Sequence, residues 1–252
     1  MTALYDFLGG NVLSGGLQNV CGSFLVDFKD SLYQNFIEDD RYMYLVSGLG
    51  TTLVITLFAV LIGIVLGFLV AIVRSTYDKT GKLKVLSKIC GCYLTIIRGT
   101  PAVVQLLIMY YIVFVNFDSK ITVAIIAFGI NSGAYVAEIV RSGIMSIDKG
   151  QMEAGRSLGF GYAQTMWYII IPQAFKNVLP ALANEFIVLL KETSICGYIG
   201  LMDLTRGGDI IRSRTYEAFL PLFAVALIYL LLVMILTKLV SILERRLRTS
   251  ER

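Results

Sequence analysis

The sequence predicts an all-α integral membrane protein with five transmembrane helices, its N-terminus outside and its C-terminus in the cytoplasm. Of the 252 residues, 56% are hydrophobic and 16% are charged, whereas about a quarter of the residues of a soluble domain are charged. The apolar residues gather in five runs near the ~20 residues that a helix needs to cross a bilayer. Lysine and arginine gather on one side of these runs, and that bias sets the predicted orientation.

Residues 1–45 precede the first apolar run and are predicted to form a peripheral segment on the outer side of the membrane. Residues 1–23 lack the basic start of a cleavable signal peptide and are interrupted by glycines. A short amphipathic helix is expected over 24–37, and an acidic triplet follows at 38–40.

The transmembrane domain is expected over 46–245, with a short cytoplasmic tail over 246–252. Two of its helices are interrupted, one by Pro101 and the other by Pro180. Such breaks are tolerated in a membrane where other protein or a water-filled path satisfies the freed backbone groups. We therefore expect these two helices, the second and the fourth, to line a pathway. The five expected helices are 46–73, 85–115, 121–147, 172–199 and 218–243.

The distribution of basic residues predicts which connections are cytoplasmic. The segments 74–88, 141–176 and 238–252 carry twice as many lysines and arginines as all the segments on the opposite side. Cytoplasmic connections of membrane proteins carry such an excess, so residues 148–171 are expected to face the cytoplasm. The formal charge of +4 is explained in the same way, and no nucleic-acid partner is expected.

Residues 148–171 are expected to form a helix–turn–helix elbow. Asp148 and Gln151 have the spacing of a capping box, and Gly159 supplies a stop for the helix that begins there. Ala154 and Leu158 stack on one side of this short helix at i, i+4. The residues alone allow two interpretations, an amphipathic connector on the membrane surface or a helix that docks into a groove on another protein.

Metal, redox and nucleotide chemistry have little support in the sequence. There are no histidines, and Cys90 and Cys92 form a C-x-C pair without the second pair that a zinc site would need. The stretch LSGGLQ at 13–18 looks like part of an ATPase, but nothing in the chain fits the phosphate-binding pattern G-x4-G-K-[ST]. The chain is therefore expected to be neither an enzyme nor a metalloprotein.

Several motifs resemble one family. Glu153-Ala154-Gly155, Gly159 and Ile169-x-Ile171-Pro172 resemble the EAA loop of ABC importer permeases, whose pattern is EAA-x3-G-x9-I-x-LP. Only Gly155 and Ile171 depart from that pattern. Further resemblance to the permeases for polar amino acids begins near Val46, and residues 1–45 do not carry it. It lies in Arg98–Pro101 with Gln105, in Asn131–Arg141, in Asn184–Phe186 and in Leu190–Ser194.

This resemblance implies a type I ABC importer permease fold in a bacterial cytoplasmic membrane, with a cytoplasmic coupling (EAA) helix. It also implies partners: two copies of an ABC ATPase subunit, a second permease subunit of the same or a different kind, an extracytoplasmic solute-binding protein and a polar amino acid. ATP and magnesium would bind the ATPase, so no cofactor is expected in this chain. The implied ATPase-coupling residues are Gln151, Glu153, Ala154, Gly155, Arg156, Leu158 and Gly159.

Ionisable side chains within spanning helices are costly and usually mark pathways or partners. A transported amino acid needs a carboxylate for its ammonium group and a cation for its carboxylate. Glu138 has a structural alternative, because Arg141 lies three residues along the same helix face. If Glu185 faces the pathway unpaired, it favours a cationic substrate. The expected pathway residues are Thr100, Gln105, Tyr135, Glu138, Asn184, Glu185 and Lys191.

Two other classes of membrane protein compete with this interpretation. An ion-coupled secondary amino acid transporter is the alternative, but it needs no docking elbow and usually shows repeat symmetry, which is not visible here. An intramembrane enzyme needs a nucleophile and base, or a metal set, at membrane depth. The scattered carboxylates do not supply one.

Overall fold

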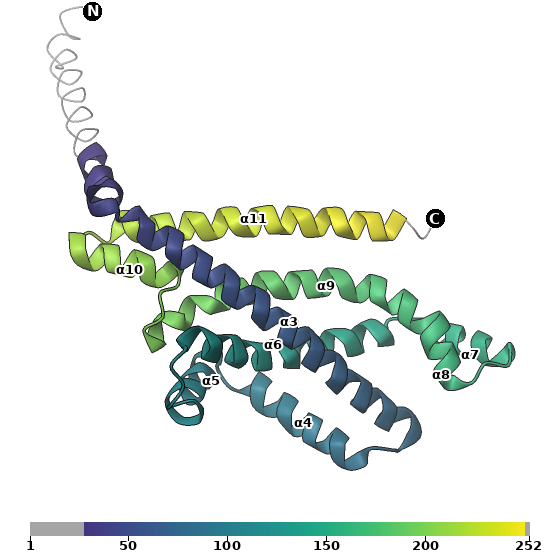
Figure 1. Cartoon of the computed structure of the whole chain (residues 1–252). Coiled ribbons are helices and arrows are strands. Elements are labelled where there is room, and N and C mark those ends of the chain that lie inside the picture. Colours follow the sequence, from purple (N-terminus) through teal and green to yellow (C-terminus); the bar gives the residue numbers. More distant parts are fainter. Residues whose placement is uncertain (1–27, 250–252) are drawn as a thin grey trace, which may run out of the picture.

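The computed structural model describes residues 28–249, and within that range every regular element is a helix (Figure 1). The predicted helix over 24–37 is helical from residue 28 onward. Its first residues and the LSGGLQ stretch lie outside the described part. The main helices are α3 (Tyr42–Thr80), α4 (Lys84–Gly99), α5 (Ala102–Ile108), α6 (Lys120–Met145), α7 (Lys149–Ser157), α8 (Tyr162–Thr165), α9 (Ile171–Glu192), α10 (Leu204–Thr215) and α11 (Phe219–Thr249). Short π- and 3-10 segments are η1 (Tyr33–Ile37), η2 (Glu38–Asp40), η3 (Met109–Val113), η4 (Met166–Ile170) and η5 (Thr193–Ile199).

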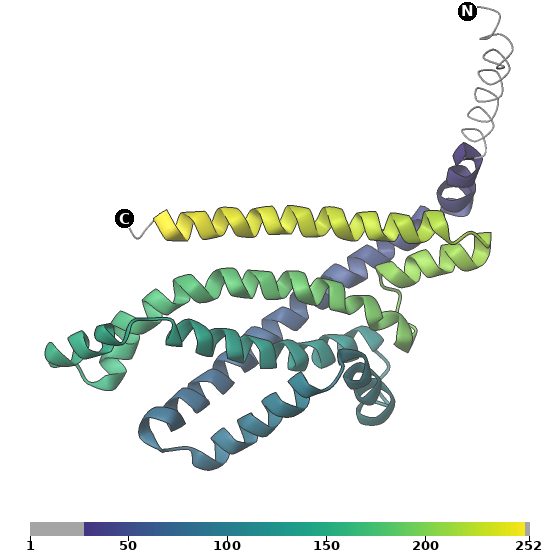
Figure 2. The ribbon, with the colours of Figure 1, turned by 180° about the vertical axis from the view of Figure 1, so that it is seen from behind.

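Helix α6 is the centre of the bundle. In its most apolar stretch 67% of the residues are buried, against 17% in α11. Helix α3 crosses α6 and α9 obliquely, while α11 runs along the outer side of α9 (Figures 1 and 2). The elbow formed by α7 and α8, the turn between α3 and α4, and the end of α11 all lie at one end of the bundle. Helix α10 and η1 lie at the other end (Figure 2).

Glycines bring α3 and α6 into close contact. A Cβ atom added at Gly67 would lie 2.5 Å from Val136 Cγ1, and one added at Gly129 would lie 2.7 Å from Ile62 Cγ2. Small residues at helix contacts let backbones approach closely, and such packing drives helix association in lipid. We call this contact the glycine seam. It includes Gly63, whose added Cβ would lie 2.8 Å from Ser132.

Within residues 28–249, three helices are long and apolar enough to cross a membrane, over 42–78, 120–145 and 219–247. They agree with the first, third and fifth predicted helices. The second, predicted as one helix over 85–115, is instead α4 followed by α5 and η3, bent by 110°. The bend lies at Thr100 and Pro101, because proline lacks an N–H and disfavours helical backbone in the residue before it.

The fourth predicted helix, 172–199, appears as α9 followed by η5. Helix α9 does not reach the hydropathy of a membrane span, because polar side chains such as Gln173, Lys176 and Asn177 interrupt its apolar residues. Length and hydropathy therefore give three spans, or four with the bent pair, where the sequence predicted five.

Helix α10 lies in a stretch for which the sequence predicts no helix. The buried carboxylate of Asp203 begins it by accepting the N–H groups of Thr205 and Arg206, each at 3.2 Å. The Leu204 N–H donates to Thr52 Oγ1 at 3.1 Å, which fixes α10 against α3. Large apolar side chains are exposed along α3 and α11, including Leu57, Leu61 and Leu231. A surface of this kind fits contact with lipid rather than with water.

Candidate functional site

The elbow over 148–171 is built from α7, a tight turn and α8. Asp148 Oδ1 accepts the Gly150 N–H at 2.7 Å and so begins α7. Gly159 ends it with a φ of +82°, and the Phe160 N–H donates to the Gly155 carbonyl at 3.1 Å, as in a Schellman motif. The predicted capping box of Asp148 and Gln151 is wrong, because Asp148 accepts the N–H of Gly150 and not that of Gln151. The Gln151 side chain instead accepts from Gln173 Nε2 at 3.4 Å.

One predicted coupling residue lies inside the elbow. Gly155 is buried, and a Cβ there would lie 2.5 Å from Thr165 Cγ2. Thr165 is itself buried, and its Oγ1 donates to the Gly161 carbonyl at 3.1 Å. Gly155 therefore holds the two limbs of the elbow together and is not on its outer surface. The other coupling residues are exposed: Gln151, Glu153, Ala154, Arg156, Leu158 and Gly159.

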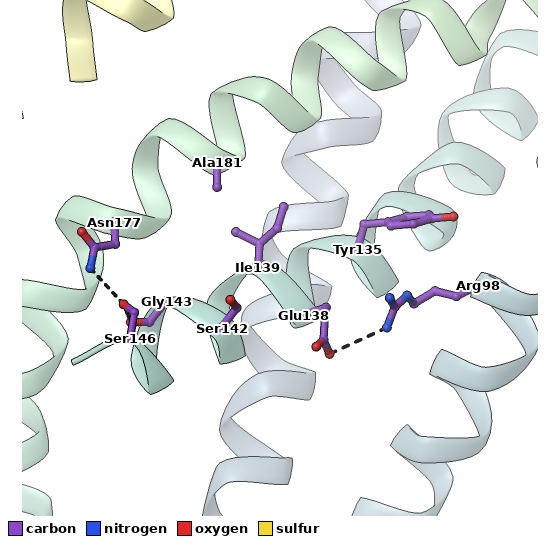
Figure 3. A pocket seen from close by; sticks show the side chains of 9 residues that line it. All are labelled: Arg98, Tyr135, Glu138, Ile139, Ser142, Gly143, Ser146, Asn177 and Ala181. Atoms are coloured by element: carbon purple, nitrogen blue, oxygen red, sulfur yellow. Dashed lines mark hydrogen bonds and ion pairs between the residues drawn. The ribbon is translucent and has the colours of Figure 1, made fainter. Parts of the chain in front are cut away.

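The elbow is fixed to the helices on either side of it. Its second limb, α8 and η4, continues directly into α9, with Pro172 in the first turn of α9. Asn177 Nδ2, farther along α9, donates to Ser146 Oγ at the end of α6 at 2.9 Å (Figure 3). Together with the bond between Gln173 and Gln151, this contact joins α6, the elbow and the start of α9 into one unit.

The break between α4 and α5 is held by an amide network. Gln105 Nε2 contacts the Ile97 carbonyl at 2.8 Å and Thr100 Oγ1 at 2.8 Å, while Asn131 Nδ2 donates to Gln105 Oε1 at 2.8 Å. Thr100 Oγ1 in turn donates to the Ile96 carbonyl at 2.8 Å. Thr100 and Gln105, both predicted to line a pathway, satisfy backbone groups that the break exposes.

A charged cluster lies where the end of α4 meets the middle of α6. Arg98 Nη1 is 3.7 Å from Glu138 Oε2 (Figure 3). Arg141 binds the same carboxylate twice, through Nε at 3.1 Å and through Nη2, so the pairing that was the alternative to a pathway role for Glu138 is present. The Arg98 guanidinium also lies 5.9 Å from the centre of the Tyr135 ring.

This cluster borders an open cavity of about 450 Å³ between α4, α6 and α9. Tyr135 and Arg98 lie at one end of it, and Asn177 and Ser146 at the other (Figure 3). The cavity thus contains two predicted pathway residues, Tyr135 and Glu138. Its remaining lining residues are Ile139, Ser142, Gly143 and Ala181.

Helix α9 continues this open face. Asn184 and Lys191 are exposed, and with Asn177, Ala181 and Val188 they recur at alternating steps of four and three residues. Residues so spaced form one stripe along a helix. We call these five residues the α9 stripe.

The neighbouring Glu185 points elsewhere, because one residue along a helix is a rotation of about 100°. It is buried, and Ser132 Oγ on α6 donates to Glu185 Oε1 at 2.9 Å. A preference for cationic substrates was expected only if Glu185 faced the pathway unpaired. Glu185 is instead buried and paired with Ser132, so this condition is not met in this structure.

Sequence reasoning missed several residues of these sites. Ser132, the partner of Glu185, and Asn177, which joins α9 to α6, had no assigned role. A signal for Asn177 was present, because it falls on the same stripe as Asn184 and Lys191. Ser132 gave no such signal, since its partner lies 53 positions away along the chain. Within residues 28–249, no three histidine, cysteine, aspartate or glutamate side chains are placed to hold a metal ion.

Comparison with known sequences gives a consistent set of relatives. Residues 63–249 match the family described as "Binding-protein-dependent transport system inner membrane component". The putative glutamine transport system permease protein GlnP of Rickettsia typhi (strain ATCC VR-144 / Wilmington) is 40% identical over 210 residues, 82% of this chain and 94% of that protein. The arginine transport system permease protein ArtQ of Bacillus subtilis (strain 168) is 38% identical over 211 residues, again 82% and 94%.

Two solved structures have a similar fold. A chain from the crystal structure of an amino acid ABC transporter with histidines is 45% identical, with a TM-score of 0.76, and the match covers 84% of this chain and 98% of that one. A chain of the methionine ABC transporter MetNI in an inward-facing conformation is 21% identical, with a TM-score of 0.71 and coverage of 82% and 97%. The second likeness concerns the fold alone.

Proposed function

The chain belongs to the family of binding-protein-dependent transport system inner membrane components, and from this we propose that it is the membrane subunit of an ATP-driven importer of polar amino acids in a bacterial cytoplasmic membrane. The family makes it a membrane transport component rather than an enzyme. The names of its relatives, which include glutamine, arginine and cystine permeases, support an amino acid as the substrate. In this proposal the ATPase, a second permease subunit and a solute-binding protein are separate chains.

The observation that carries the proposal is the elbow. It displays Glu153, Ala154, Arg156 and Leu158 outward, and the Leu158 side chain is 73% exposed. A short helix with a small residue and an exposed leucine one turn apart is suited to lie in a groove on another protein. We assign that groove to the ATPase, because the residues match the coupling motif of ABC importers and the elbow is firmly fixed to two long helices.

Coupling follows from the way in which the elbow is attached. When two ATPase subunits close on ATP, each groove moves as a rigid body and carries its elbow with it. Because α6, the elbow and α9 are joined through Asn177 and Gln173, the movement passes to both helices together. The membrane pathway then changes the side to which it opens. Linkage is reciprocal, so a loaded solute-binding protein docked on the outer side should favour closure of the ATPase.

We place the pathway along the open face of α6 and α9. The α9 stripe carries the exposed polar side chains of Asn177, Asn184 and Lys191, and its Asn177 end borders the cavity that Tyr135, Arg98 and Glu138 also line. In the proposed dimer this face meets its counterpart on the second permease subunit. Lys191 and Arg98 would attract the substrate carboxylate, and Glu138, which is paired with Arg141 and Arg98, would hold Arg98 beside the cavity. Thr100, Gln105 and Glu185 would act indirectly, by holding the break in α4–α5 and the contact of α6 with α9.

The proposed orientation uses five spans, with α9 and η5 counted as the fourth and the bent pair α4–α5 as the second. The N-terminal end then lies outside and the C-terminal end in the cytoplasm. In its support, the basic residues near the α3–α4 turn, the elbow and the end of α11 all lie at one end of the bundle (Figure 1), which the positive-inside rule would place in the cytoplasm.

The test is ATP-driven uptake in proteoliposomes that contain this chain, its ATPase and the binding protein loaded with one amino acid at a time. Leu158→Asp puts a charge on the docking face and should reduce both uptake and stimulated ATP hydrolysis at least tenfold, as the loss of about 1.4 kcal/mol of docking energy would do. Leu83→Asp is the matched control. It makes the same change at an exposed leucine in the α3–α4 turn, outside the elbow, and should leave both rates unchanged.

Two results would contradict the proposal. Uptake that proceeds without any ATPase and follows an ion gradient would indicate a secondary transporter. Equal loss of activity in Leu158→Asp and Leu83→Asp would show that a charge anywhere at this end is harmful, and the elbow would lose its special role.

A further inference from the structure

An apolar cavity of about 430 Å³ lies between the last turns of α3, the end of α6 and the second limb of the elbow. Phe68 and Ile72 line it from α3, Val140 from α6, and Trp167 and Phe175 from η4 and α9. Its size falls within the range of small-molecule sites in proteins, roughly 300–1,000 Å³. Ile72, Trp167 and Phe175 are also exposed at its rim, so the cavity is accessible from the side of the bundle.

A second cavity of about 300 Å³ adjoins the first and has a different character. The two share Ser75, Ile144, Tyr162 and Met166 as lining residues, so they form one continuous cleft. The second cavity is charged where the first is apolar, and its charged lining residues are Asp78, Arg141, Asp148 and Lys149. We call the two cavities together the elbow cleft.

The charges in the polar part differ in how they are satisfied. Arg141 is bound by Glu138, and Asp148 accepts the Gly150 N–H. Asp78 and Lys149 make no hydrogen bond or ion pair with any residue in the described range 28–249, and the Asp78 carboxylate only attracts Arg141 from beyond ion-pair distance. The cleft therefore presents one carboxylate and one ammonium group that are available to a ligand, next to an apolar compartment.

We propose that the elbow cleft binds a phospholipid of the surrounding bilayer, with an acyl chain in the apolar part and a headgroup that carries a primary ammonium in the polar part. Lys149 contacts the phosphate, and Asp78 contacts the ammonium. Opposite charges on the two sides of the polar part match a zwitterionic headgroup better than an anionic one.

The position of the cleft relative to the membrane supports a lipid as its occupant. Trp167 and Tyr168 are each 67% exposed beside it, and these two residue types gather at the level of the headgroups in membrane proteins. Below that level α3 exposes Leu61, Val65 and Leu69, which are suited to contact acyl chains. A lipid chain can thus enter the cleft sideways from the bilayer while its headgroup stays at the interface.

Occupancy has a mechanical consequence for the elbow. The cleft has α3 on one side and α8, η4 and the start of α9 on the other. A bound lipid fills the space between them and holds the elbow at a fixed distance from α3. The lipid composition of the membrane would then influence the position of the elbow relative to α3. This effect does not depend on whether the partner of the elbow is an ATPase.

The test uses a natural probe, because Trp167 is the only tryptophan in the chain and it lines the cleft. The full-length protein is placed in vesicles that contain increasing fractions of a brominated, tryptophan-quenching phosphatidylethanolamine or of the matching brominated phosphatidylcholine. We expect half-maximal quenching at a mole fraction about fivefold lower for the ethanolamine lipid, the factor that one net hydrogen bond contributes, because its primary ammonium can donate hydrogen bonds to Asp78 and the trimethylated nitrogen of choline cannot.

Variants distinguish the cleft from ordinary lipid contact. Asp78→Asn should remove the preference for ethanolamine, and Lys149→Gln should weaken quenching by both brominated lipids at low mole fraction. Ser75→Phe, at the junction of the two cavities, should block entry of the acyl chain. Leu69→Phe is its control, on the exposed surface of the same helix but outside the cleft, and should behave as the wild type.

Equal quenching of the wild-type protein by the two lipids would overturn the proposal, because a surface tryptophan in contact with bulk lipid behaves in that way. A brominated phosphatidylglycerol that quenches at a lower mole fraction than the ethanolamine lipid would overturn the assignment of Asp78. Unchanged quenching in Ser75→Phe would exclude the apolar cavity as the site of the chain.

Discussion

Gly159 is the residue on which the shape of the elbow depends. Its φ of +82° belongs to the left-handed region, which costs other residues roughly 1–2 kcal/mol. A Cβ added at this position would meet no atom within 4 Å, so the first penalty of a substitution is the strain of the backbone. At Gly159 the turn that follows α7 therefore depends on a backbone angle, whereas at Gly155 it depends on packing against Thr165.

We predict that Gly159→Val destabilises the elbow while Gly159→Asn largely preserves it, because asparagine enters the left-handed region more readily than a β-branched residue. The expected difference between the two variants is about 1 kcal/mol. Protease sensitivity of the 148–171 segment in the membrane-inserted protein measures it. If both variants are cleaved at the same rate, the left-handed conformation is not what holds the turn.

The adjacent residues Asn184 and Glu185 show how far the polarity of a residue predicts whether it faces the pathway. Both were predicted to line a pathway from their polarity in an apolar helix. Their places on α9 differ by one step, so Asn184 falls on the open stripe and Glu185 turns toward Ser132. Helical periodicity separates the two residues, but it does not say which face meets α6. That choice depends on a contact between distant parts of the chain.

At the scale of the elements, the glycine seam determines how closely α3 and α6 pack. Gly67→Val would bring a Cβ within 2.5 Å of Val136 Cγ1 and force the helices apart. Overpacking of this kind typically costs about 1–3 kcal/mol. Gly50→Val is the matched control on the same helix, because a Cβ at Gly50 meets no atom within 4 Å. We predict a lower midpoint of thermal unfolding in detergent for Gly67→Val than for Gly50→Val. Equal midpoints would mean that the seam can widen without cost.

The elements were predicted with unequal success, for physical reasons. Long apolar runs located α3, α6 and α11, because lipid demands both length and hydropathy, although α3 and α11 extend seven and six residues beyond their predicted ends. The sequence predicted a break at Pro101 but not the 110° bend between α4 and α5. The contacts that hold this bend join Gln105 to Ile97, Thr100 and Asn131. Helix α10 escaped prediction because its stability comes from the Asp203 cap and from Thr52 on α3, and its own residues are mostly polar.

At the scale of the whole molecule, α6, the elbow and α9 are expected to move as one body. A disulfide between Ser146→Cys and Asn177→Cys tests this, because the Asn177 amide and the Ser146 hydroxyl, the groups that the two cysteines replace, lie 2.9 Å apart. We predict that the oxidised protein retains most of its ATP-driven uptake in proteoliposomes. Loss of uptake on oxidation, with recovery after reduction, would show that α6 and α9 must separate during transport. Each single-cysteine variant serves as the control for the substitution itself.

The glycine seam also bears on how the chain is made. Chains are synthesised from the N-terminus, and α3 enters the membrane before α4, α5 and α6 exist. Until α6 arrives, the surface of α3 around Gly63 and Gly67 has no partner within the described part of the chain. A nascent protein halted before residue 120 would therefore contain a membrane-spanning helix, α3, whose packing face is empty. Such truncated products should be short-lived in the membrane, whereas chains that extend past Met145 should persist.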